Sequence, residues 1–263
     1  LRDFTINALY ADAEGHVYDP LGGLPDLHRR RVYFIGVARE RIREDYLRIL
    51  RFFRFTAEYA EDGLDAVGTH AVIAERAGLA QLSAERIHAE LWRILCSKTP
   101  MRALVPMSEA GLLTMILGGV VHVTCFERMV ALEAYFGLPC DPIRRIADLA
   151  LMIEEDVVRL TTRLRLSNAE VVRLSEMAAY RPIFTREMSE SAAREQLYRL
   201  GENAYRDRML LTWARIGDAA SDDTWQELYA LPERWQVPEF FLKGQDLIAV
   251  GVERGPRIGE TLR

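Results

Sequence analysis

The chain has 263 residues, 49% of them hydrophobic and 28% charged, with a formal net charge of −5 at pH 7. This length and apolar content can bury a sizeable core and favour two or more subdomains. The negative balance argues against a uniformly basic nucleic-acid binder. No run of about eighteen apolar residues exists, which argues against a membrane span.

The N-terminal part is predicted to be the end of a mixed α/β unit. Residues 4–11 are rich in apolar side chains, 13–15 are typical of a turn and 16–18 of a short strand, so a β-hairpin is expected. Residues 25–28 are predicted as one short helical turn and 31–35 as a strand. A sheet that lacks strands exposes its edges, so we expect this part to be unstable alone or completed by another chain.

From about residue 39 onward, the apolar periodicity is that of α-helices. Ser83, Asp141-Pro142 and Ser167 are predicted helix starts. Residues 231–239, which contain two prolines, are predicted to be a linker. The predicted helices cover residues 44–59, 64–78, 83–97, 100–110, 125–136, 141–155, 167–179, 188–201, 202–217 and 221–230.

The stretch Glu44 to Phe55 has helical periodicity, yet its polar side is unlike an ordinary solvated face. One side carries Tyr46, Leu47, Ile49, Leu50 and Phe53, and the other carries Asp45, Arg48, Arg51 and Arg54 with Phe52 and Phe55 among them. Two phenylalanines among three arginines indicate that another part of the molecule or a ligand covers this face. Arginine binds phosphate groups and the planar polar edges of bases well. The alternative is a buried helix with a few salt bridges.

Charge is unevenly distributed along the sequence. Residues 28–54 hold nine arginines against Glu40, Glu44 and Asp45, a balance of +6, so the remaining residues sum to −11. A local basic patch suits a triphosphate or an RNA end better than a long groove. Alternatively, the arginines pair with neighbouring acids.

The cysteines and histidines show no metal-binding spacing. Cys96, Cys125 and Cys140 lack a C-x-x-C pattern, and the five histidines are scattered. Three unpaired cysteines fit a reducing compartment, so a cytoplasmic location is expected. Asp222 and Asp223 are adjacent rather than alternating, and no metal ligand is assigned to them.

Four segments, in their order and spacing, resemble motifs of the class II tRNA nucleotidyltransferases. This family comprises the bacterial CCA-adding enzymes, the A-adding enzymes and the bacterial poly(A) polymerases. The segments are Leu1 to Leu9 (RRDFTxNA without its first Arg), Asp19 to Leu27 (DxxGGxxDL), Glu44 to Phe55 (EDxxRxxRxxRF) and Glu85 to Leu91 (ERIxxEL). The resemblance is strong over residues 1–95 and weaker beyond, where it rests on 244–247 and 255–259.

The chain departs from the family pattern at its start. The family's Gly-rich phosphate-binding turn and metal-binding Asp-x-Asp pair are absent from this sequence. We therefore expect a fragment of a longer protein, with the ligands of Mg²⁺ in a segment before Leu1. No catalytic or metal-binding residue is assigned within this chain, which is expected to be inert alone.

The resemblance implies roles for two sets of residues. The nucleotide-binding set is Arg2, Asp3, Asn7, Asp45, Arg48, Arg51 and Arg54, and the set that supports it structurally is Gly22, Gly23, Asp26, Glu85, Arg86 and Glu90. Gly22 and Gly23 are expected to allow a tight backbone turn. The acids and Arg86 are expected to brace the helix that reads the base.

Donor–acceptor chemistry supports base reading by Asp45 and Arg48, which stand at i and i+3. A carboxylate accepts a hydrogen bond and a guanidinium donates one. Cytosine and adenine both present an amino donor beside a ring-nitrogen acceptor, whereas guanine and uracil present the reverse. Each mismatched contact costs roughly 1–3 kcal/mol. The alternative is an intrahelical salt bridge, worth about 0.3–0.5 kcal/mol.

The expected fold is mostly α, with a small residual α/β piece of a nucleotidyltransferase head followed by an all-helical neck, body and tail. The expected divisions are 1–38 (head), 39–110 (neck, with the base-reading helix and an RNA-binding region) and 111–263 (body and tail, binding tRNA). Possible RNA contacts are Tyr135, Arg144, Arg145, Arg159, Arg163 and Arg165.

The expected function is CCA addition to tRNA 3′ ends from CTP and ATP with Mg²⁺. The alternatives are a bacterial poly(A) polymerase, whose usual basic extension this acidic tail does not resemble, and a non-catalytic helical RNA-binding protein.

Overall fold

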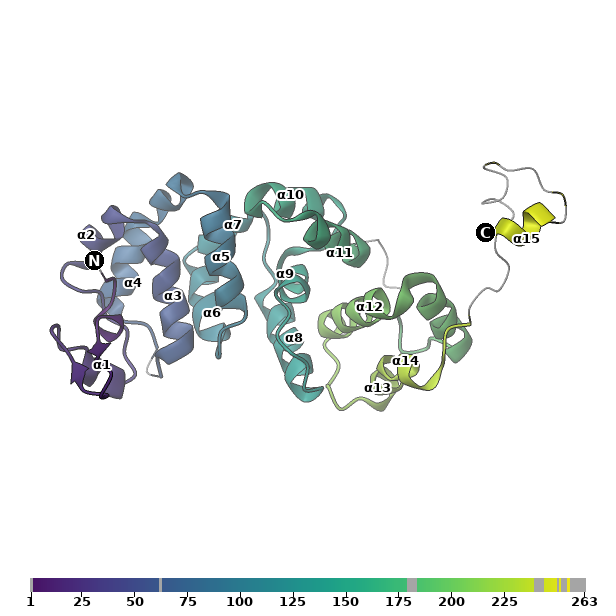
Figure 1. Cartoon of the computed structure of the whole chain (residues 1–263), viewed down its shortest axis with the longest axis horizontal. Coiled ribbons are helices and arrows are strands. Elements are labelled where there is room, and N and C mark those ends of the chain that lie inside the picture. The colour runs from purple at the N-terminus through teal and green to yellow at the C-terminus, as the bar shows by residue number, and fades with distance from the viewer. Residues whose placement is uncertain are drawn as a thin grey trace.

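The computed structural model describes residues 2–61, 63–178, 184–238, 244–249, 251 and 255. Its helices follow one another along the long axis of the molecule, with a small irregular region at the N-terminal end (Figure 1). This confirms the mostly helical fold class. Across these described ranges, no helix combines the length and apolarity that crossing a bilayer requires.

The N-terminal region contains the predicted hairpin. Strands β1 (Tyr10–Ala11) and β2 (Val17–Tyr18) pair antiparallel. They follow a 3-10 turn, η1 (Thr5–Asn7), and precede α1 (Gly23–His28), which begins two residues before the predicted turn.

The predicted strand 31–35 is wrong as a regular strand, because only one isolated bridge forms, between Phe4 and Phe34. The backbone N–H of Ile35 donates to the Asp3 carbonyl at 3.0 Å, and that of Thr5 donates to the Tyr33 carbonyl at 3.1 Å. The segment that pairs with 31–35 becomes the 3-10 turn η1 at Thr5, so no further strand hydrogen bonds form there.

The next helices along the chain are α2 (Ala38–Glu44), α3 (Leu47–Tyr59), α4 (Ala66–Glu75), η2 (Arg76–Gln81) and α5 (Ala84–Leu95). The single helix predicted over 44–59 is therefore wrong at its start. Asp45 is extended, with φ −160° and ψ 107°, and separates α2 from α3. Its carboxylate accepts from the backbone N–H of Leu47 at 3.1 Å, which favours a new helix start over continuation.

The middle of the chain consists of α6 (Met101–Glu109), α7 (Leu112–Leu117), α8 (Val123–Tyr135), α9 (Pro142–Ala150), α10 (Glu155–Leu164) and α11 (Asn168–Ala178). The sequence did not predict α7 or α10, and the helix predicted over 141–155 ends early. Asp156 accepts from the backbone N–H groups of Met152 and Ile153, at 2.8 and 3.1 Å, and so stabilises the turn between α9 and α10. The predicted cap at Asp141 is confirmed.

The C-terminal helices are α12 (Glu190–Ile216), α13 (Asp223–Tyr229), α14 (Leu231–Arg234) and α15 (Gly244–Ala249). Gly201 interrupts α12 with φ 72° and ψ 166°, which agrees with the two helices predicted on either side of it. The short α14 lies inside the predicted linker. Asp222 is the N-cap of α13. Of the predicted tail motif 255–259, all but Gly255 lies outside the described residues.

One hydrophobic cluster runs from Phe4 to Leu231 and links the N-terminal region to the helices. The rings of Phe4, Phe34 and Phe52 meet in it, with centroids 4.9 Å apart for Phe4–Phe34 and 5.3 Å for Phe34–Phe52. Packing of this kind fixes α3 against the segment that carries Arg2 and Asp3.

Three of the arginines predicted as possible RNA contacts serve the fold instead. Arg144 and Arg145 are buried and form ion pairs with buried Glu133, at 2.9 and 2.6 Å. Arg159 donates to the carbonyl of Leu117 at 2.6 Å and to that of Ala150 at 2.8 Å. Arg144 and Arg145 are therefore not available to RNA, and the hydrogen bonds of Arg159 connect α10 to the ends of α7 and α9.

The expectation of three unpaired cysteines is also wrong. Cys96 and Cys140 form a disulfide bond, and Cys125 is free. Their separation of 44 positions in the sequence gave no spacing signal for this pairing.

Candidate nucleotide-binding site

Helix α3 packs on α5 and α6, and its face of arginines and phenylalanines contacts both the N-terminal region and Glu90 of α5. Phe52 is fully buried and Phe55 is partly buried. The guanidinium carbons of Arg54 and Arg51 lie 4.5 and 5.6 Å from the Phe55 ring centroid. The prediction that this face is not open to bulk water is therefore confirmed.

Arg48 is held on several sides and is only 8% exposed. Its Nη1 donates to the Arg41 carbonyl at 2.5 Å and to Glu44 Oε2 at 2.6 Å. Its Nε lies 3.7 Å from Asp3 Oδ1. The guanidinium is thus oriented before any ligand arrives, which reduces the entropy cost of using it for recognition.

The segment Arg2 to Asn7 contributes a buried carboxylate to the same region. Asp3 is buried and accepts from Arg51 Nε. The Arg2 carbonyl accepts from Arg41 Nη2, while the exposed Arg2 guanidinium lies 5.9 Å from the Tyr10 ring centroid. Asn7 accepts from the backbone N–H of Phe4 at 3.3 Å. Asn7 therefore shapes the turn that carries Asp3.

Asp45 does not share a helix with Arg48, because it occupies the break between α2 and α3. Its Oδ2 accepts from Arg86 Nη2 of α5 at 2.8 Å. The interpretation as an intrahelical Asp45–Arg48 salt bridge is wrong, since Asp45 pairs with Arg86 and Arg48 with Glu44 and Asp3. The i,i+3 helical spacing assumed from sequence does not describe their geometry.

The charge of Asp45 is stabilised despite its partial burial. Desolvation by itself raises the pKa of this carboxyl, but hydrogen bonds from Arg86 and from the Leu47 backbone outweigh it and hold the pKa below its ordinary value. The carboxylate is therefore an acceptor at neutral pH, as reading an amino group requires.

Helix α5 braces the arginines of α3. Glu90 is buried and accepts from Arg54 Nε at 2.8 Å and from Arg93 Nη1 at 2.9 Å, and it lies 3.9 Å from Arg51 Nη1. Glu85 lies in the first turn of α5, where hydrogen bonds with its own backbone and with Ser83 lower the pKa of its carboxyl. Arg86 and Glu90 thus reach the α2–α3 region, whereas Glu85 stabilises the start of its own helix.

The glycine pair allows α1 to approach the N-terminal segment closely. Gly22 has φ +71°, a left-handed conformation, and a Cβ at Gly23 would lie 2.2 Å from the Thr5 carbonyl oxygen. Asp26 accepts from the Thr5 hydroxyl at 2.7 Å. These contacts hold the turn that carries Asp3 against α1.

Arg41 and Glu44 also belong to this cluster, although sequence reasoning did not select them. Glu44 Oε2 accepts from Arg41 Nη1 at 2.5 Å as well as from Arg48. Hydrogen bonds from Arg48, with a further contribution from Arg41, hold the pKa of the Glu44 carboxyl below its ordinary value. The spacing of Arg41, Glu44 and Arg48 could have indicated this contact, because residues three and four apart are neighbours on helices.

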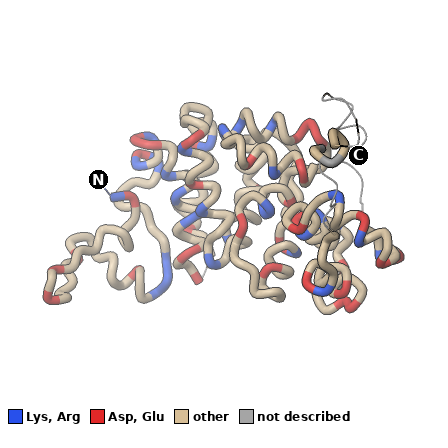
Figure 2. Tube along the Cα trace, turned by 45° about the vertical axis from the view of Figure 1, so that its right-hand side comes forward, with Lys and Arg blue, Asp and Glu red and all other residues tan. Residues whose placement is uncertain are grey.

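The predicted basic patch is largely neutralised by pairing. Figure 2 shows basic and acidic residues interleaved along the helices. Arginines of the stretch 28–54 form ion pairs with Asp3, Glu44, Glu61, Glu75 and Glu90. The alternative reading, that these arginines pair with neighbouring acids, describes the structure better than an open positive surface.

Within the described ranges, no three His, Cys, Asp or Glu side chains come together as a group that could hold a metal ion. A metal ion for the expected activity therefore finds no three-ligand cluster among these residues.

Two family models match the chain. The model described as "Poly A polymerase head domain" matches residues 1–33, and the model described as "Probable RNA and SrmB- binding site of polymerase A" matches residues 69–121. The first match contains the Asp3 turn and the glycine pair, and the second contains α5.

Curated relatives match over the full chain. It is 30% identical over 268 residues to "CCA tRNA nucleotidyltransferase 1, mitochondrial" of Mus musculus and 32% identical over 278 residues to the protein of that name in Danio rerio. Each alignment covers 100% of this chain and 60% of the relative. The chain thus spans about three fifths of the length of these curated relatives.

Solved structures share the fold. The Bacillus stearothermophilus CCA-adding enzyme in complex with CTP aligns with a TM-score of 0.73 and 25% identity, over 99% of this chain and 66% of that chain. The Thermotoga maritima CCA-adding enzyme complexed with tRNA aligns with a TM-score of 0.68 and 19% identity, over the same shares, and supports the fold alone. The ordered motifs, the helical fold and these matches agree, and the chain is similar to the class II nucleotidyltransferases, the family that includes the CCA-adding enzymes and the bacterial poly(A) polymerases.

Proposed function

We propose that the protein to which this chain belongs is a nucleotidyltransferase that adds C and A, from CTP and ATP, to the 3′ ends of tRNA. The names of the curated relatives and the CTP complex of the solved structure at 25% identity support this activity. The observation that carries it in this chain is the pair of braced groups at the α2–α3 break, Asp45 and Arg48.

In this proposal, Asp45 and Arg48 read the pairing edge of the incoming base. The Asp45 carboxylate accepts from the amino group of cytosine or adenine, and the Arg48 guanidinium donates to the adjacent ring nitrogen. Arg86 orients Asp45, while Glu44 and the Arg41 carbonyl orient Arg48. Guanine and uracil leave these groups unpaired, at a cost of roughly 1–3 kcal/mol for each contact.

The remaining proposed nucleotide-binding residues divide into two roles. Arg51 and Arg54 are paired with Asp3 and Glu90, which favours shaping of the pocket over direct phosphate binding. Arg2 is exposed beside Asp3, and we assign it to the triphosphate and Asp3 to a ribose hydroxyl. Asn7 supports both through the turn that it shapes.

A divalent metal ion is part of the proposed activity, and we propose Mg²⁺. A metal ion supplies charge stabilisation and activates the attacking hydroxyl in such transfers. Its ligands are assigned to a part of the protein outside this chain, and the residues of this chain bind, orient and select the nucleotide.

The division into head (1–38), neck (39–110) and body with tail (111–263) remains our prediction. The neck and the helices beyond it are proposed to hold tRNA. The match of residues 69–121 to a model named for RNA binding supports the neck assignment. The exposed side chain of Tyr135 is a candidate contact in the body.

The second candidate function is poly(A) addition, because both matched family models are named for poly(A) polymerases. An assay with the complete protein separates the two. Labelled CTP, ATP, UTP and GTP are offered singly, with Mg²⁺, to tRNAs that lack CCA, lack CA or lack only the terminal A.

CCA addition predicts C incorporation on the first two of these tRNAs and A incorporation on the third. Incorporation of A alone on all three would establish A addition. If no nucleotide is incorporated, the remaining interpretation is a non-catalytic RNA-binding protein.

A further inference from the structure

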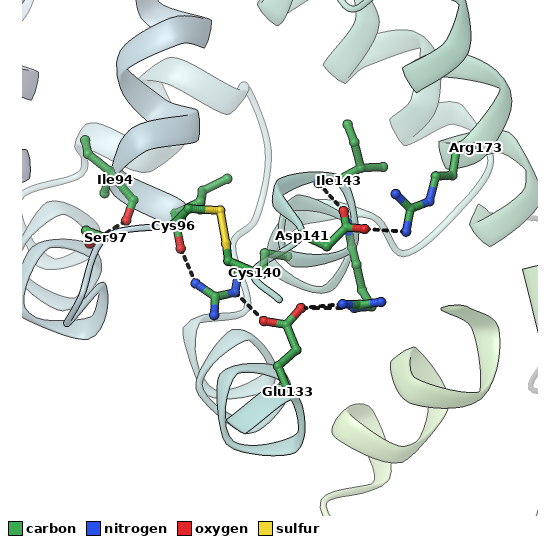
Figure 3. The surroundings of a disulfide bond; sticks show 11 residues. Ile94, Cys96, Ser97, Glu133, Cys140, Asp141, Ile143 and Arg173 are labelled. Carbon is green, nitrogen blue, oxygen red and sulfur yellow. Dashed lines mark hydrogen bonds and ion pairs between the residues drawn. A yellow bond between two sulfur atoms is a disulfide. The ribbon is translucent and has the colours of Figure 1, made fainter. Parts of the chain in front are cut away.

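A disulfide bond joins the end of helix α5 to the loop before α9. Cys96 is the C-cap of α5, and Cys140 directly precedes Asp141, the N-cap of α9 (Figure 3). The two Cα atoms are 5.7 Å apart, close to the commonest separation for disulfides. The bond therefore needs no displacement of either backbone.

The bond lies at the surface of the molecule. Cys96 is exposed and Cys140 is partly exposed, whereas Glu133 and Arg145 beside them are buried. An accessible disulfide can be attacked by a thiolate, while an enclosed one is protected. The position thus suits exchange with thiols in solution.

The same joint is held by contacts that do not involve sulfur. Arg145 donates to the Leu95 carbonyl and to Glu133 Oε2, the latter at 2.6 Å, and so connects α5, α8 and α9. The Nε2 atom of His88 in α5 lies 3.5 Å from the Oε1 atom of Glu170 in α11. Because these contacts do not involve the sulfur atoms, we expect the two thiols to stay close together after reduction, so that the bond can re-form.

The joint connects the candidate nucleotide site to the C-terminal half. Helix α5 carries Arg86 and Glu90, which hold Asp45 and Arg54. Helix α9 packs on α8, α11 and α12. A covalent bond from the end of α5 to the start of α9 therefore limits the movement of the bracing helix relative to the helices beyond it.

We propose that Cys96 and Cys140 form a reversible thiol–disulfide site whose oxidation fixes the α5–α9 joint. Its exchange partner is a low-molecular-weight thiol of the glutathione class or a protein dithiol. Reduction breaks the sulfur–sulfur bond, converts both cysteines to thiols and oxidises two partner thiols to one disulfide. Oxidation reverses these steps, with two electrons transferred in each direction. This site is independent of the proposed nucleotidyl transfer.

Thiol counting in the complete protein tests the chemistry. The protein is equilibrated in buffers of varied reduced-to-oxidised glutathione ratio, quenched with acid, and labelled after unfolding with a maleimide mass tag. We expect two more tags in the reducing limit than in the oxidising limit, with Cys96 and Cys140 peptides linked in the latter. Cys125→Ser should retain this two-tag change, and Cys140→Ser should lose it.

Two results would overturn the reversible site. One is a Cys96–Cys140 bond that fails to form at any glutathione ratio. The other is a bond that resists excess dithiol reductant until denaturant is added.

Hydrogen exchange tests the mechanical consequence. Backbone amides at residues 95–99 and 137–141 should exchange faster in the reduced protein than in the oxidised protein. Cys96→Ser should exchange like the reduced form under both conditions, while Cys125→Ser should follow wild type. Equal exchange at the joint in both redox states would show that the bond does not fix it, and would refute that part of the proposal.

Discussion

Individual charged side chains of the candidate site are held by partners that lie far from them in the sequence. Asp45 is held by Arg86, Arg54 by Glu90, and Arg51 by Asp3. Such partners fix the direction of each group, and a recognition site that selects by geometry needs that support. At this scale the chain also holds one buried carboxylate, Asp148, with no hydrogen-bond partner for either oxygen among the described residues.

We predict that Asp45→Ala and Arg48→Ala relax base choice in the complete enzyme. Removing the Asp45 carboxylate deletes the acceptor for the amino group, so UTP and GTP should be rejected less strongly. Removing Arg48 should impair CTP and ATP use alike, because both bases present the ring-nitrogen acceptor. The measurement is the ratio of CTP to UTP incorporation, and of ATP to GTP, in each variant.

Ratios that stay within about twofold of wild type, a difference of roughly 0.4 kcal/mol, would contradict base reading by this pair. Glu85→Ala is the matched control, because Glu85 lies in the exposed first turn of α5 and bonds with its own backbone and with Ser83, the N-cap of that helix. Its base ratios should equal those of wild type.

We predict that Asp148 makes the fold less stable as pH rises. Burial raises its pKa to about 7 from 3.8, and the nearby Arg215 opposes that only in part. The protonated carboxyl therefore stabilises the fold fully below pH 3.8, and this advantage is lost as pH rises through about 7. Between these two pH values, the free energy of unfolding is expected to fall by about 1.4 kcal/mol per pH unit.

Urea unfolding of wild type and Asp148→Asn at several pH values measures this effect. The free energy of unfolding of Asp148→Asn should not show this fall with pH. The variant should therefore become more stable relative to wild type as pH increases. Asp223→Asn, which changes an exposed carboxylate, is the control and should keep the wild-type profile. Parallel profiles for wild type and Asp148→Asn would show that Asp148 does not titrate in this range.

At the scale of elements, side-chain caps decide where the helices begin and end. Asp45 starts α3, Asp141 starts α9, and Asp156 closes the turn before α10. Asp45 and Asp141 accept from backbone N–H groups in the first turn of a helix, and Asp156 accepts from those of the turn that connects α9 to α10. The α3–α5 pair then depends on Glu90, a buried acid between arginines of two helices.

We predict that Glu90→Ala lowers the free energy of unfolding by about 3 kcal/mol, because removing one partner of a buried ion pair leaves the other uncompensated. Thermal and urea unfolding measure the change. Glu85→Ala on the same helix is the matched control, with an expected change of about 0.5 kcal/mol or less. Equal effects of the two substitutions would mean that Glu90 adds nothing beyond an ordinary surface charge.

At the scale of the whole molecule, one apolar cluster and one buried ion cluster join successive groups of helices. Glu133 pairs with Arg144 and Arg145, and Arg144 also lies 3.3 Å from Asp207 of α12. These charges come from α8, α9 and α12, so they link the middle of the chain to its C-terminal helices. The disulfide adds a covalent connection at the same joint.

We predict that the isolated 263-residue chain incorporates neither CTP nor ATP into tRNA. In the proposed function the ligands of the metal ion lie outside this chain, so without them the attacking hydroxyl would not be activated and the leaving pyrophosphate would not be stabilised. Labelled-nucleotide incorporation with Mg²⁺ measures this, with the complete protein as the positive control. Robust activity of the isolated chain would show that the active site has been assigned to the wrong region.

The sequence by itself indicated the family resemblance and determined the helical class and several helix starts. The four motifs carry enough residues in a set order to indicate the family. Capping residues such as Ser83 and Asp141 act through neighbours in the sequence, and this local chemistry can be read directly. The cover over the arginine face of α3 was also predictable, because Phe52 and Phe55 lie among its charges.

Only the tertiary structure decided which partner each charge and each cysteine has. Arg144 and Arg145 read as surface residues, yet α9 is surrounded by other helices and every residue from Ile143 to Ala150 is buried. Asp45 read as part of a helix, but Arg86, 41 positions later, holds it at a break. Cys96 meets Cys140 across 44 positions. Such contacts depend on how helices pack, and helical periodicity reveals which face is apolar but not which element covers it.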